Sequence, residues 1–360
     1  MSVRAVLAIP ARNEVDRLPV CLASIAAQLD ALPAAVVVLL NNCTDGSADA
    51  VRRFAMRAPM PVHAIECTLP PQRLSAGTAR RLAMARAARM AGPDGVLLTT
   101  DADSVLPPDW VANTLRVMAA GADAVAGRTV IDPVEARAIP QALHDADARE
   151  CAYGTLLDEV TSLIDPDPTD PWPRHDEASG ASLAVTVAAW RRAGGIPPLP
   201  LGEDRAFAAA LRRVDARLRH ALDVWVTVSG RTEGRAAGGM ADTMRRRIVA
   251  ADLMLDDRLE PARASARRAR LRRAARAVHA ARGDPQALAR ALRLPHVAPL
   301  AAGCFGAAWE ALEAVSPVLR RHRVPVADLA AQSAIARAIR DRLVSRDPAD
   351  PADTGACVTA

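Results

Sequence analysis

Two aspartates stand one residue apart where an apolar run of the chain ends. The run Val96–Thr100 is followed by Asp101, Ala102 and Asp103. A hard divalent cation such as Mg²⁺ or Mn²⁺ prefers oxygen ligands, and it commonly takes one or two carboxylates from the protein and the rest from water and substrate phosphates. An isolated Asp-x-Asp is more often a loop with two solvated aspartates, so the pair becomes a candidate cation site only through its position and its companions.

Two more polar segments follow apolar runs. Pro10 fixes the direction in which the chain leaves the first run, so the polar side chains of Pro10–Glu14 could reach a ribose or a base. A polar turn at the start of a helix explains this segment equally well. Asn41–Ser47 combines turn formers with a candidate N-cap, and taken alone it is more often only a turn and cap. The candidate ligand contacts in the two segments are Pro10, Ala11, Arg12, Asn13, Glu14 and Asn41.

A later β-rich run ends in arginines. Within Val226–Arg235, Arg231 and Arg235 lie close to glycines at the end of the run. A guanidinium pairs well with phosphate oxygens and can offset the charge of a leaving group. Both arginines are therefore candidate contacts of a phosphate group.

The elements that must position these residues follow from the periodicity of the first hundred residues. Short β-rich runs alternate with Ala, Leu and Arg-rich stretches of helical period, which is typical of βαβ units and a parallel sheet. Ligands of open α/β sheets bind at the carboxyl ends of the strands, so we expect the polar segments to converge on one crevice. The expected strands are Val3–Ile9, Ala35–Leu40, Val62–Ile65 and Val96–Thr100, and the expected helices are Arg17–Leu29, Ser47–Arg57 and Ser75–Met90.

The rest of the chain is less regular. Asp165–Pro173 is rich in Pro and Asp and predicts a surface loop that could cover a site. From about Ala241 the sequence is nearly all helix-forming, and after Ser345 it becomes rich in Pro, Asp and Gly. We expect an α/β domain over residues 1–240, with halves at 1–110 and 111–240, a helical appendage over 241–345 and a flexible tail over 346–360.

Composition narrows the class of protein. The 360 residues are 51% hydrophobic and 24% charged, which suffices for a substantial core. Six cysteines without a C-x-x-C pair argue against a zinc ribbon or a dense disulfide framework and fit a reduced compartment. The sequence contains neither a long uncharged apolar run nor a cleavable signal at its start, so we expect a cytoplasmic location.

The chain has a net positive charge, which could attract anionic partners. The net charge is +5, but five Trp, one Tyr and three Phe are too few to form stacking platforms, so no nucleic-acid partner is expected. The Arg-dense segment Arg263–Arg282 could contact the inner face of an anionic membrane, where lipid-linked acceptors reside. The favoured interpretation is a solvated basic face of the appendage.

In combination, these segments resemble the family-two glycosyltransferases, whose nucleotide-sugar-binding architecture is called the GT-A fold. Members open with a strand and a P-x-x-N-E segment, here Pro10–Glu14, and follow the second strand with a sequence like D-N-N-S-T-D-G-T, here Leu40–Ser47. The family's D-x-D matches Asp101–Asp103, and its l-x-P-D-W continuation matches Leu106–Trp110. The resemblance implies a Rossmann-like, mixed and mainly parallel sheet flanked by helices, in an enzyme that moves a sugar from a nucleotide-diphosphate-sugar donor to an acceptor hydroxyl.

The resemblance also implies roles for particular residues. Gly202–Phe207 is similar to the family's E-D motif, whose Asp is the general base in inverting members; this implies Asp204 as base, with Glu203 beside it. Favourable charge in a first helical turn also explains the pair. Gly77 and Arg80 resemble the family's G-x-x-x-A-R-N segment and are candidate donor contacts, although a surface helix start explains them equally well. A Mn²⁺ or Mg²⁺ ion is implied on Asp103, with Asp101 assisting or touching the ribose.

Some questions stay open at this stage. Leu40 and Asn41 stand where relatives often have an Asp that contacts uracil, and Arg12 replaces a common aromatic residue, so the base of the donor is undefined. The donor sugar, the acceptor (a small molecule, a glycan or a lipid-linked hydroxyl) and the stereochemical outcome are also undefined. A nucleotidyltransferase of related fold is the closest rival, but Pro10–Glu14 lacks the glycines of its usual loop. A non-catalytic sugar-binding relative is the second alternative.

Overall fold

The computed structural model describes residues 3–232, 234 and 238–345. The chain divides into two compact units, which we call the sheet unit and the helical unit. The sheet unit comprises Met1–Pro140, Glu177–Arg212 and Ala216–Val249, and the helical unit comprises Gln141–Asp176, Arg213–Asp215 and Ala250–Ala360. Each unit therefore contains segments that are far apart in the sequence.

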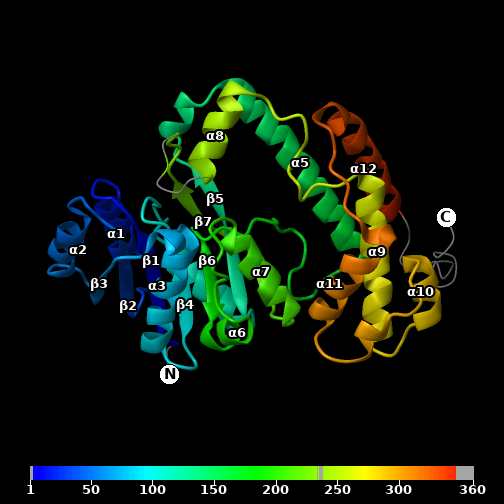
Figure 1. The fold of residues 1–360 in the computed structure, drawn as a ribbon, viewed down its shortest axis with the longest axis horizontal. Coiled ribbons are helices and arrows are strands. Elements are labelled where there is room, and N and C mark those ends of the chain that lie inside the picture. Colours follow the sequence, from blue (N-terminus) through cyan, green and yellow to red (C-terminus); the bar gives the residue numbers. More distant parts are fainter. Residues whose placement is uncertain (1–2, 233, 235–237, 346–360) are drawn as a thin grey trace. The chain divides into compact units, whose positions relative to one another are not determined.

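The described residues of the sheet unit form one seven-stranded sheet with the order β3-β2-β1-β4-β6-β5-β7 (Figure 1). Strands β3, β2, β1 and β4 are parallel, whereas β6 runs antiparallel to both β4 and β5. Strand β7 is parallel to β5. The expected mixed, mainly parallel sheet flanked by helices is confirmed. The strands are β1 (Ala5–Ala11), β2 (Ala35–Asn41), β3 (Val62–Cys67), β4 (Val96–Thr99), β5 (Ala124–Ile131), β6 (Leu183–Thr186) and β7 (Leu218–Val228).

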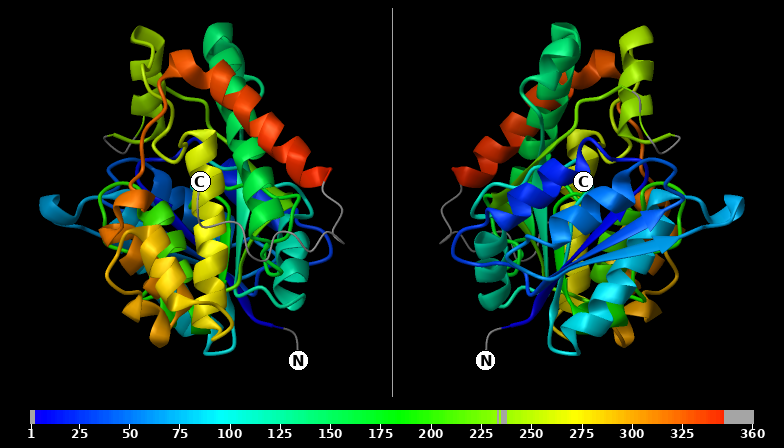
Figure 2. Two further views of the ribbon diagram at one scale, coloured as in Figure 1. Left: turned by 90° about the vertical axis from the view of Figure 1, so that its right-hand side faces the viewer. Right: turned by 90° about the vertical axis from the view of Figure 1, so that its left-hand side faces the viewer.

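Helices cover both faces of this sheet. The apolar residues of α1, α2 and α4 share one core with Leu7, Val38 and Leu98 of the central strands, and α3 packs on β1, β2 and β4. Figure 2 shows the fanned N-terminal strands, as the right-handed twist of strands requires. The helices of the unit are α1 (Leu18–Ala26), α2 (Ser47–Ala55), α3 (Ala76–Ala91), α4 (Trp110–Ala119), α6 (Val187–Arg192), α7 (Glu203–Arg213) and α8 (Met240–Val249).

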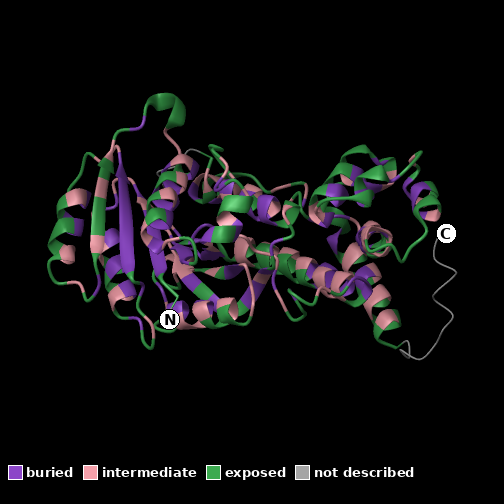
Figure 3. Ribbon diagram, turned by 90° about the horizontal axis from the view of Figure 1, so that it is seen from below, coloured by how far each residue is buried: buried purple, intermediate pink, exposed green. Residues whose placement is uncertain are grey.

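The burial of the strands follows their place in the sheet. Every residue of β2 is buried, and its sequence AVVVLLN is a nearly continuous apolar run, as is usual for a parallel strand covered on both faces. The edge strand β3 is partly exposed along its whole length, which Figure 3 shows beside the buried strand. The four strands and three helices expected in the first hundred residues are all present, with ends shifted by three residues at most.

The helical unit contains α5 (Gln141–Ile164) together with the C-terminal helices. Tyr153, Leu156 and Leu157 of α5 share a core with Leu259 and Ala336. A second core joins α9, α10 and α11 through residues that include Leu292, Phe305 and Trp309. The other helices of this unit are α9 (Ala262–His279), α10 (Pro285–Leu292), α11 (Phe305–Val315) and α12 (Leu329–Val344), with the short 3-10 helices η3 (Ala298–Ala301), η4 (Pro317–Leu319) and η5 (Val326–Asp328). Two further 3-10 helices, η1 (Pro71–Arg73) and η2 (Glu135–Ala138), belong to the sheet unit.

The division of the chain differs from the expected boundary at residue 240. Residues 141–176 were expected in the acceptor half of the α/β domain, but they belong to the helical unit. The physical reason is the apolar stripe of α5, which recurs at helical spacing through Tyr153, Val160 and Ile164 and packs on α9 and α12. The expected tail, residues 346–360, lies outside the described residues.

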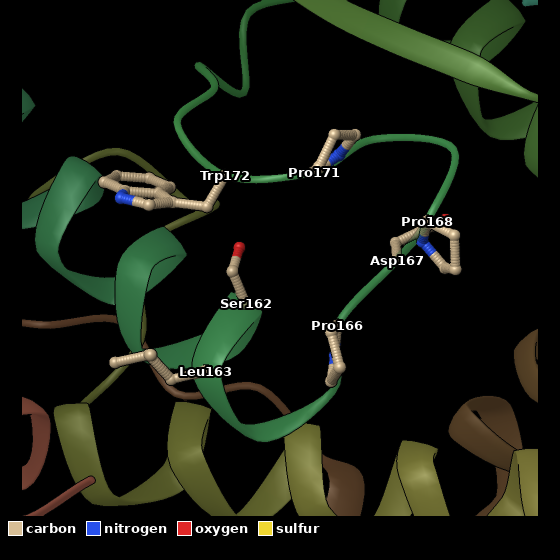
Figure 4. Close-up of a pocket in the computed structure, with 7 residues that line it drawn as sticks. All are labelled: Ser162, Leu163, Pro166, Asp167, Pro168, Pro171 and Trp172. Atoms are coloured by element: carbon tan, nitrogen blue, oxygen red, sulfur yellow. The ribbon is translucent and has the colours of Figure 1, made fainter. Parts of the chain in front are cut away.

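The loop after α5 is exposed over most of its length, as its Pro-rich composition predicts. It curves around a cavity of about 290 Å³ in the helical unit. Figure 4 shows Ser162 and Leu163 of α5 on one side of this cavity, and Pro166, Asp167, Pro168, Pro171 and Trp172 along the loop. Across the described residues, no helix combines the length and the apolar character needed to cross a membrane.

Candidate functional site

The predicted polar segments meet at one edge of the sheet unit. Strands β1, β2 and β4 are parallel neighbours, so the residues that follow them lie at the same edge. Asp101 and Asp103 come directly after β4, while Pro10 and Ala11 end β1. A bridge between Val105 and Thr227 brings the end of β7 to this edge as well. The convergence expected from the strand pattern is therefore present.

Arg231 lies between two carboxylates at this edge. Its Nη1 and Nη2 atoms donate to Glu14 at 2.9 and 2.6 Å, and Nη2 lies 3.1 Å from an oxygen of Asp103. The Glu14 side chain is 7% exposed and that of Asp103 is 17% exposed. Burial opposes the charged guanidinium, but Glu14 and Asp103 outweigh it and raise the pKa of Arg231. Arg231 therefore stays cationic beside the Asp-x-Asp pair.

A second layer of contacts holds the backbone at Arg231. Ser229 Oγ donates to Glu135 at 2.8 Å, and the Gly230 amide donates to the same carboxylate at 2.6 Å. Glu135 also forms an ion pair with Arg17 at 2.8 Å. Sequence reasoning missed Glu135, because no local motif marks a carboxylate that acts on a loop 94 residues away.

Asp103 lies in an electrostatic environment that opposes its ionised form. Burial raises its pKa to about 6; the charges of Asp101 and Glu14 add to this effect and Arg231 opposes it. Two neighbouring carboxylates repel each other, so an additional positive charge nearby lowers their electrostatic energy. The edge is therefore chemically suited to a cation.

Arg80 occupies a buried position behind the pair. Its side chain is 4% exposed, and Nη2 donates to Asp101 at 2.6 Å while Nε donates to Glu203 at 3.2 Å. Nη1 donates to Thr99 Oγ1 at 3.0 Å and to the Gly180 carbonyl at 2.8 Å. Burial opposes the charge of Arg80, but the two carboxylates outweigh it and raise its pKa. Arg80 thus joins the end of β4 to the start of α7.

The Glu203-Asp204 pair begins α7, as the E-D motif predicts, but its two members have different surroundings. Glu203 is buried against Arg80, whereas Asp204 is only half-buried. Asp204 Oδ2 accepts from the Gly180 amide at 3.1 Å, and Oδ1 accepts from the Arg205 amide at 2.7 Å. Asp204 is thus the accessible carboxylate, and both of its oxygens are oriented by backbone donors.

The segments after β1 and β2 lock together. Asn13 has a positive φ of 54°, and its Oδ1 accepts from the Thr44 amide at 2.8 Å. The Glu14 amide donates to Ser47 Oγ at 2.9 Å. Arg12 is half-buried and Asn41 is buried at the end of β2. This pairing gives a defined position to the loop expected to contact a ribose or base.

Asn42 has a role that sequence reasoning missed. Its Oδ1 accepts from the Leu69 amide at 2.9 Å, and its Nδ2 donates to the Leu69 carbonyl at 3.0 Å. Its φ is 51°, a conformation that Asn tolerates better than most residues. The signal in the sequence is the turn-forming pair Asn41-Asn42, but turn chemistry by itself does not indicate a partner 27 residues away.

Gly77 is fixed by packing in this structure. A Cβ atom there would lie 2.4 Å from the Leu199 carbonyl oxygen and 2.9 Å from the Cβ of Glu203. The backbone of α3 therefore approaches the segment before α7 as closely as only glycine permits. Arg235, the other predicted phosphate contact, lies outside the described residues.

The residues present fit a divalent cation that completes its coordination with water and phosphate. No group of three or more His, Cys, Asp or Glu side chains in the described ranges is arranged to hold a metal by itself. Two carboxylates that raise each other's electrostatic energy form a donor set of the kind that hard cations share with a substrate. Asp101 and Asp103 are therefore the residues that would hold it.

Comparisons with known proteins give a match to a family model over part of the chain. An α/β sheet with its polar residues at the carboxyl ends of the strands belongs to the broad class that binds ligands there. Residues 6–168 match the model of glycosyl transferase family 2. No curated protein matches the chain.

Several solved structures are similar to this chain. The mannosyltransferase PcManGT from Pyrobaculum calidifontis, in complex with GDP-Man and Mn²⁺, is 20% identical with a TM-score of 0.45, over 95% of this chain and 85% of that one. TarS residues 1–349 from S. aureus, in complex with UDP, is 14% identical with a TM-score of 0.46, over 94% and 90%. Glucosyl-3-phosphoglycerate synthase from Mycobacterium tuberculosis, with Mn²⁺, UDP and phosphoglyceric acid, is 14% identical with a TM-score of 0.39, over 68% and 75%.

Proposed function

We propose that this protein is a glycosyltransferase of the hexosyltransferase type, which transfers a sugar from a nucleotide-diphosphate-sugar to an acceptor hydroxyl. One observation carries the proposal: Arg80 joins Asp101, of the candidate cation pair, to the start of the helix that bears Asp204. A carboxylate pair suited to a diphosphate-bound cation and an oriented carboxylate base thus belong to one connected site. The match of residues 6–168 to glycosyl transferase family 2 supports this assignment.

The donor side of the site is formed by the edge around β1 and β4. Asp103 and Asp101 would hold Mn²⁺ or Mg²⁺, which offsets the charge of the departing nucleoside diphosphate when bound. We propose that Arg231, which lies 3.1 Å from Asp103, pairs with the phosphate oxygens of the donor. The loops that contain Arg12, Asn13 and Asn41 are proposed to contact the nucleoside.

The acceptor side is formed by the start of α7. Asp204 takes the proton of the acceptor hydroxyl while that oxygen attacks the anomeric carbon, and the bond from this carbon to the diphosphate breaks on the opposite face. The product has the inverted configuration. Two backbone amides hold the carboxylate of Asp204 in one orientation, which favours its use as a general base.

The experiment that tests the assignment is a donor screen with the purified protein. UDP-, GDP- and dTDP-sugars are incubated with and without Mn²⁺, and hydrolysis of each donor is measured. We expect release of nucleoside diphosphate from one donor class, dependent on the metal. Release of pyrophosphate from a nucleoside triphosphate and a sugar phosphate would instead support the rival nucleotidyltransferase. Absence of turnover with retained sugar binding would support a non-catalytic relative.

Replacement of the proposed base gives a sharper test. We expect Asp204→Asn to lower kcat by about 10²- to 10⁴-fold, the usual contribution of a general base, with little change in donor affinity. Asp94→Asn is the matched control, because Asp94 is exposed in the turn that precedes β4, at the opposite end of this strand from Asp101. Equal turnover by Asp204→Asn and the wild type would remove Asp204 from this role.

The acceptor and the location of the protein belong to the same proposal. A cytoplasmic enzyme would meet nucleotide-sugars directly, and the acceptor is a small molecule, a glycan or a lipid-linked hydroxyl. Product analysis after incubation with extracts of each acceptor class, using a labelled donor, would identify the class.

A further inference from the structure

Arg80 has a geometry unlike that of a ligand-binding arginine. Its guanidinium is almost completely buried, and it makes four hydrogen bonds to protein groups in three separate segments. Those segments are the end of β4, the loop before β6 and the first turn of α7. Arginine suits such a position because its planar fork presents donors in several fixed directions, whereas lysine presents a single charged group.

The contacts of Arg80 form a continuous path through the site. On one side Arg80 binds Asp101, a proposed cation ligand, at 2.6 Å. On the other side it binds the Gly180 carbonyl at 2.8 Å, and the amide of the same residue donates to Asp204 at 3.1 Å. Glu203, next to Asp204 in the chain, is also bound to Arg80. The proposed cation ligand Asp101 and the proposed base Asp204 are therefore both oriented through the side chain of Arg80.

The packing around Arg80 leaves little freedom for this path. A Cβ atom on Gly180 would lie 2.4 Å from Cζ and 2.6 Å from Nε of Arg80. The glycine thus lies against the guanidinium more closely than any other residue could. On the same helix, Gly77 allows α3 to approach the Cβ of Glu203. Both small residues serve the close approach of α3 to the loops that it holds.

We propose that Arg80 is a positioning residue that fixes the base Asp204 relative to the cation ligand Asp101. This proposal rests on the proposed function, and it assigns to Arg80 a role other than direct donor contact. The reacting groups of a transferase come from two bound molecules, and rates depend steeply on their separation and orientation. A buried arginine that binds both sides keeps this geometry constant.

The test compares variants on α3. Arg80→Lys keeps the charge but loses the fork, and Arg80→Gln loses both. Arg86→Gln is the matched control, because Arg86 is exposed on the same helix. The measurements are kcat, KM for the donor, nucleoside diphosphate affinity by calorimetry, and hydrogen exchange of the peptide that spans residues 177–186. Circular dichroism establishes which variants are folded.

We expect both Arg80 variants to lower kcat by about 100-fold, the loss that a misplacement of about 1 Å can cause, while nucleotide affinity and KM stay within about threefold of wild type. The Gly180 amide should exchange at least about tenfold faster, because its bond to Asp204 is no longer held in place. Arg86→Gln should match the wild type in every measurement. If Arg80→Gln does not fold, Arg80→Lys and Gly180→Ala, which displaces the guanidinium from the other side, decide the question.

Specific outcomes would overturn the proposal. A loss confined to nucleotide affinity would make Arg80 a donor contact, and a kcat within threefold of wild type would leave it no positioning role. Unchanged exchange at residues 177–186 would contradict the path through Gly180. This last measurement needs no turnover, so it decides the role of Arg80 even if the wild-type protein transfers no sugar, which would refute the proposed function separately.

Discussion

Asp103 lies in a partly buried position beside two other carboxylates, and this position favours its protonated form. Its pKa rises from 3.8 to about 6, first because of burial and then because of Asp101. A carboxyl group with a raised pKa contributes stability that is present below about pH 4 and is lost as the pH rises through about 6. At neutral pH the ionised side chain of Asp103 therefore lowers the stability of the ligand-free protein.

This effect predicts a stabilised variant. We expect Asp103→Asn to raise the free energy of unfolding of the ligand-free protein at pH 8 by on the order of 2 kcal/mol, and this gain should vanish near pH 4. Urea denaturation at the two pH values measures it. Asp94→Asn should stay within about 0.5 kcal/mol of wild type at both values. If Asp103→Asn is less stable than the wild type at pH 8, the ion pair of Asp103 with Arg231 stabilises the protein by more than burial of the charge destabilises it.

At the scale of elements, α9 shows how a basic segment is divided between structure and surface. Arg268 and Arg276 bind the carboxylates of Glu260 and Asp165 inside the helical unit. Other arginines of the helix are exposed: Arg263, Arg267, Arg270 and Arg273. The density of arginine thus reflects internal ion pairs on one face and a solvated face on the other. Membrane contact by the exposed arginines stays a prediction, which flotation with anionic vesicles at low salt tests.

The inner face of α9 gives a prediction of stability. Arg268 binds Glu260, Glu313 and the Leu319 carbonyl, and Glu260 is 5% exposed. Arg268→Met leaves Glu260 charged and unpaired, so we expect it to lower the free energy of unfolding by roughly 3–5 kcal/mol. Arg270→Met, on the exposed face, should change it by no more than about 0.5 kcal/mol. Guanidinium denaturation of both variants measures the difference, and similar losses would mean that the pair is not essential.

At the scale of the whole molecule, the chain contains two units with separate apolar cores. Among the described residues, the candidate site belongs entirely to the sheet unit, since Glu14, Arg80, Asp103, Asp204 and Arg231 all fall in its segments. The helical unit contains none of these residues. A bound nucleotide should therefore stabilise the sheet unit directly.

This division predicts the thermal behaviour of the protein. We expect two calorimetric transitions, one for each unit, because each has its own core. A nucleoside diphosphate with Mn²⁺ at about 100 times its Kd should stabilise the sheet unit by about 2.7 kcal/mol and shift only its transition. A fluorescent label on an exposed cysteine of the helical unit, Cys151, identifies the other transition. A single transition that moves as a whole would show that the units unfold together.

The sequence alone determined the strands, the helices between them and the polar segments at the edge of the sheet. These features depend on short-range properties: β2 is an apolar run, Ser75 caps α3 through the Thr78 amide, and Pro10 and the Asn41-Asn42 pair mark the ends of strands. Local periodicity and turn chemistry report such features directly.

Only the tertiary structure decided which side chains meet and in what state. Arg80 and Glu203 are 123 residues apart, and Arg231 and Glu14 are 217 apart. The structure likewise places α5 with the C-terminal helices rather than with the sheet that precedes it. No local pattern encodes such partners, because burial and pairing arise only when distant segments pack, and it is this packing that sets the charge and orientation of the side chains at the site.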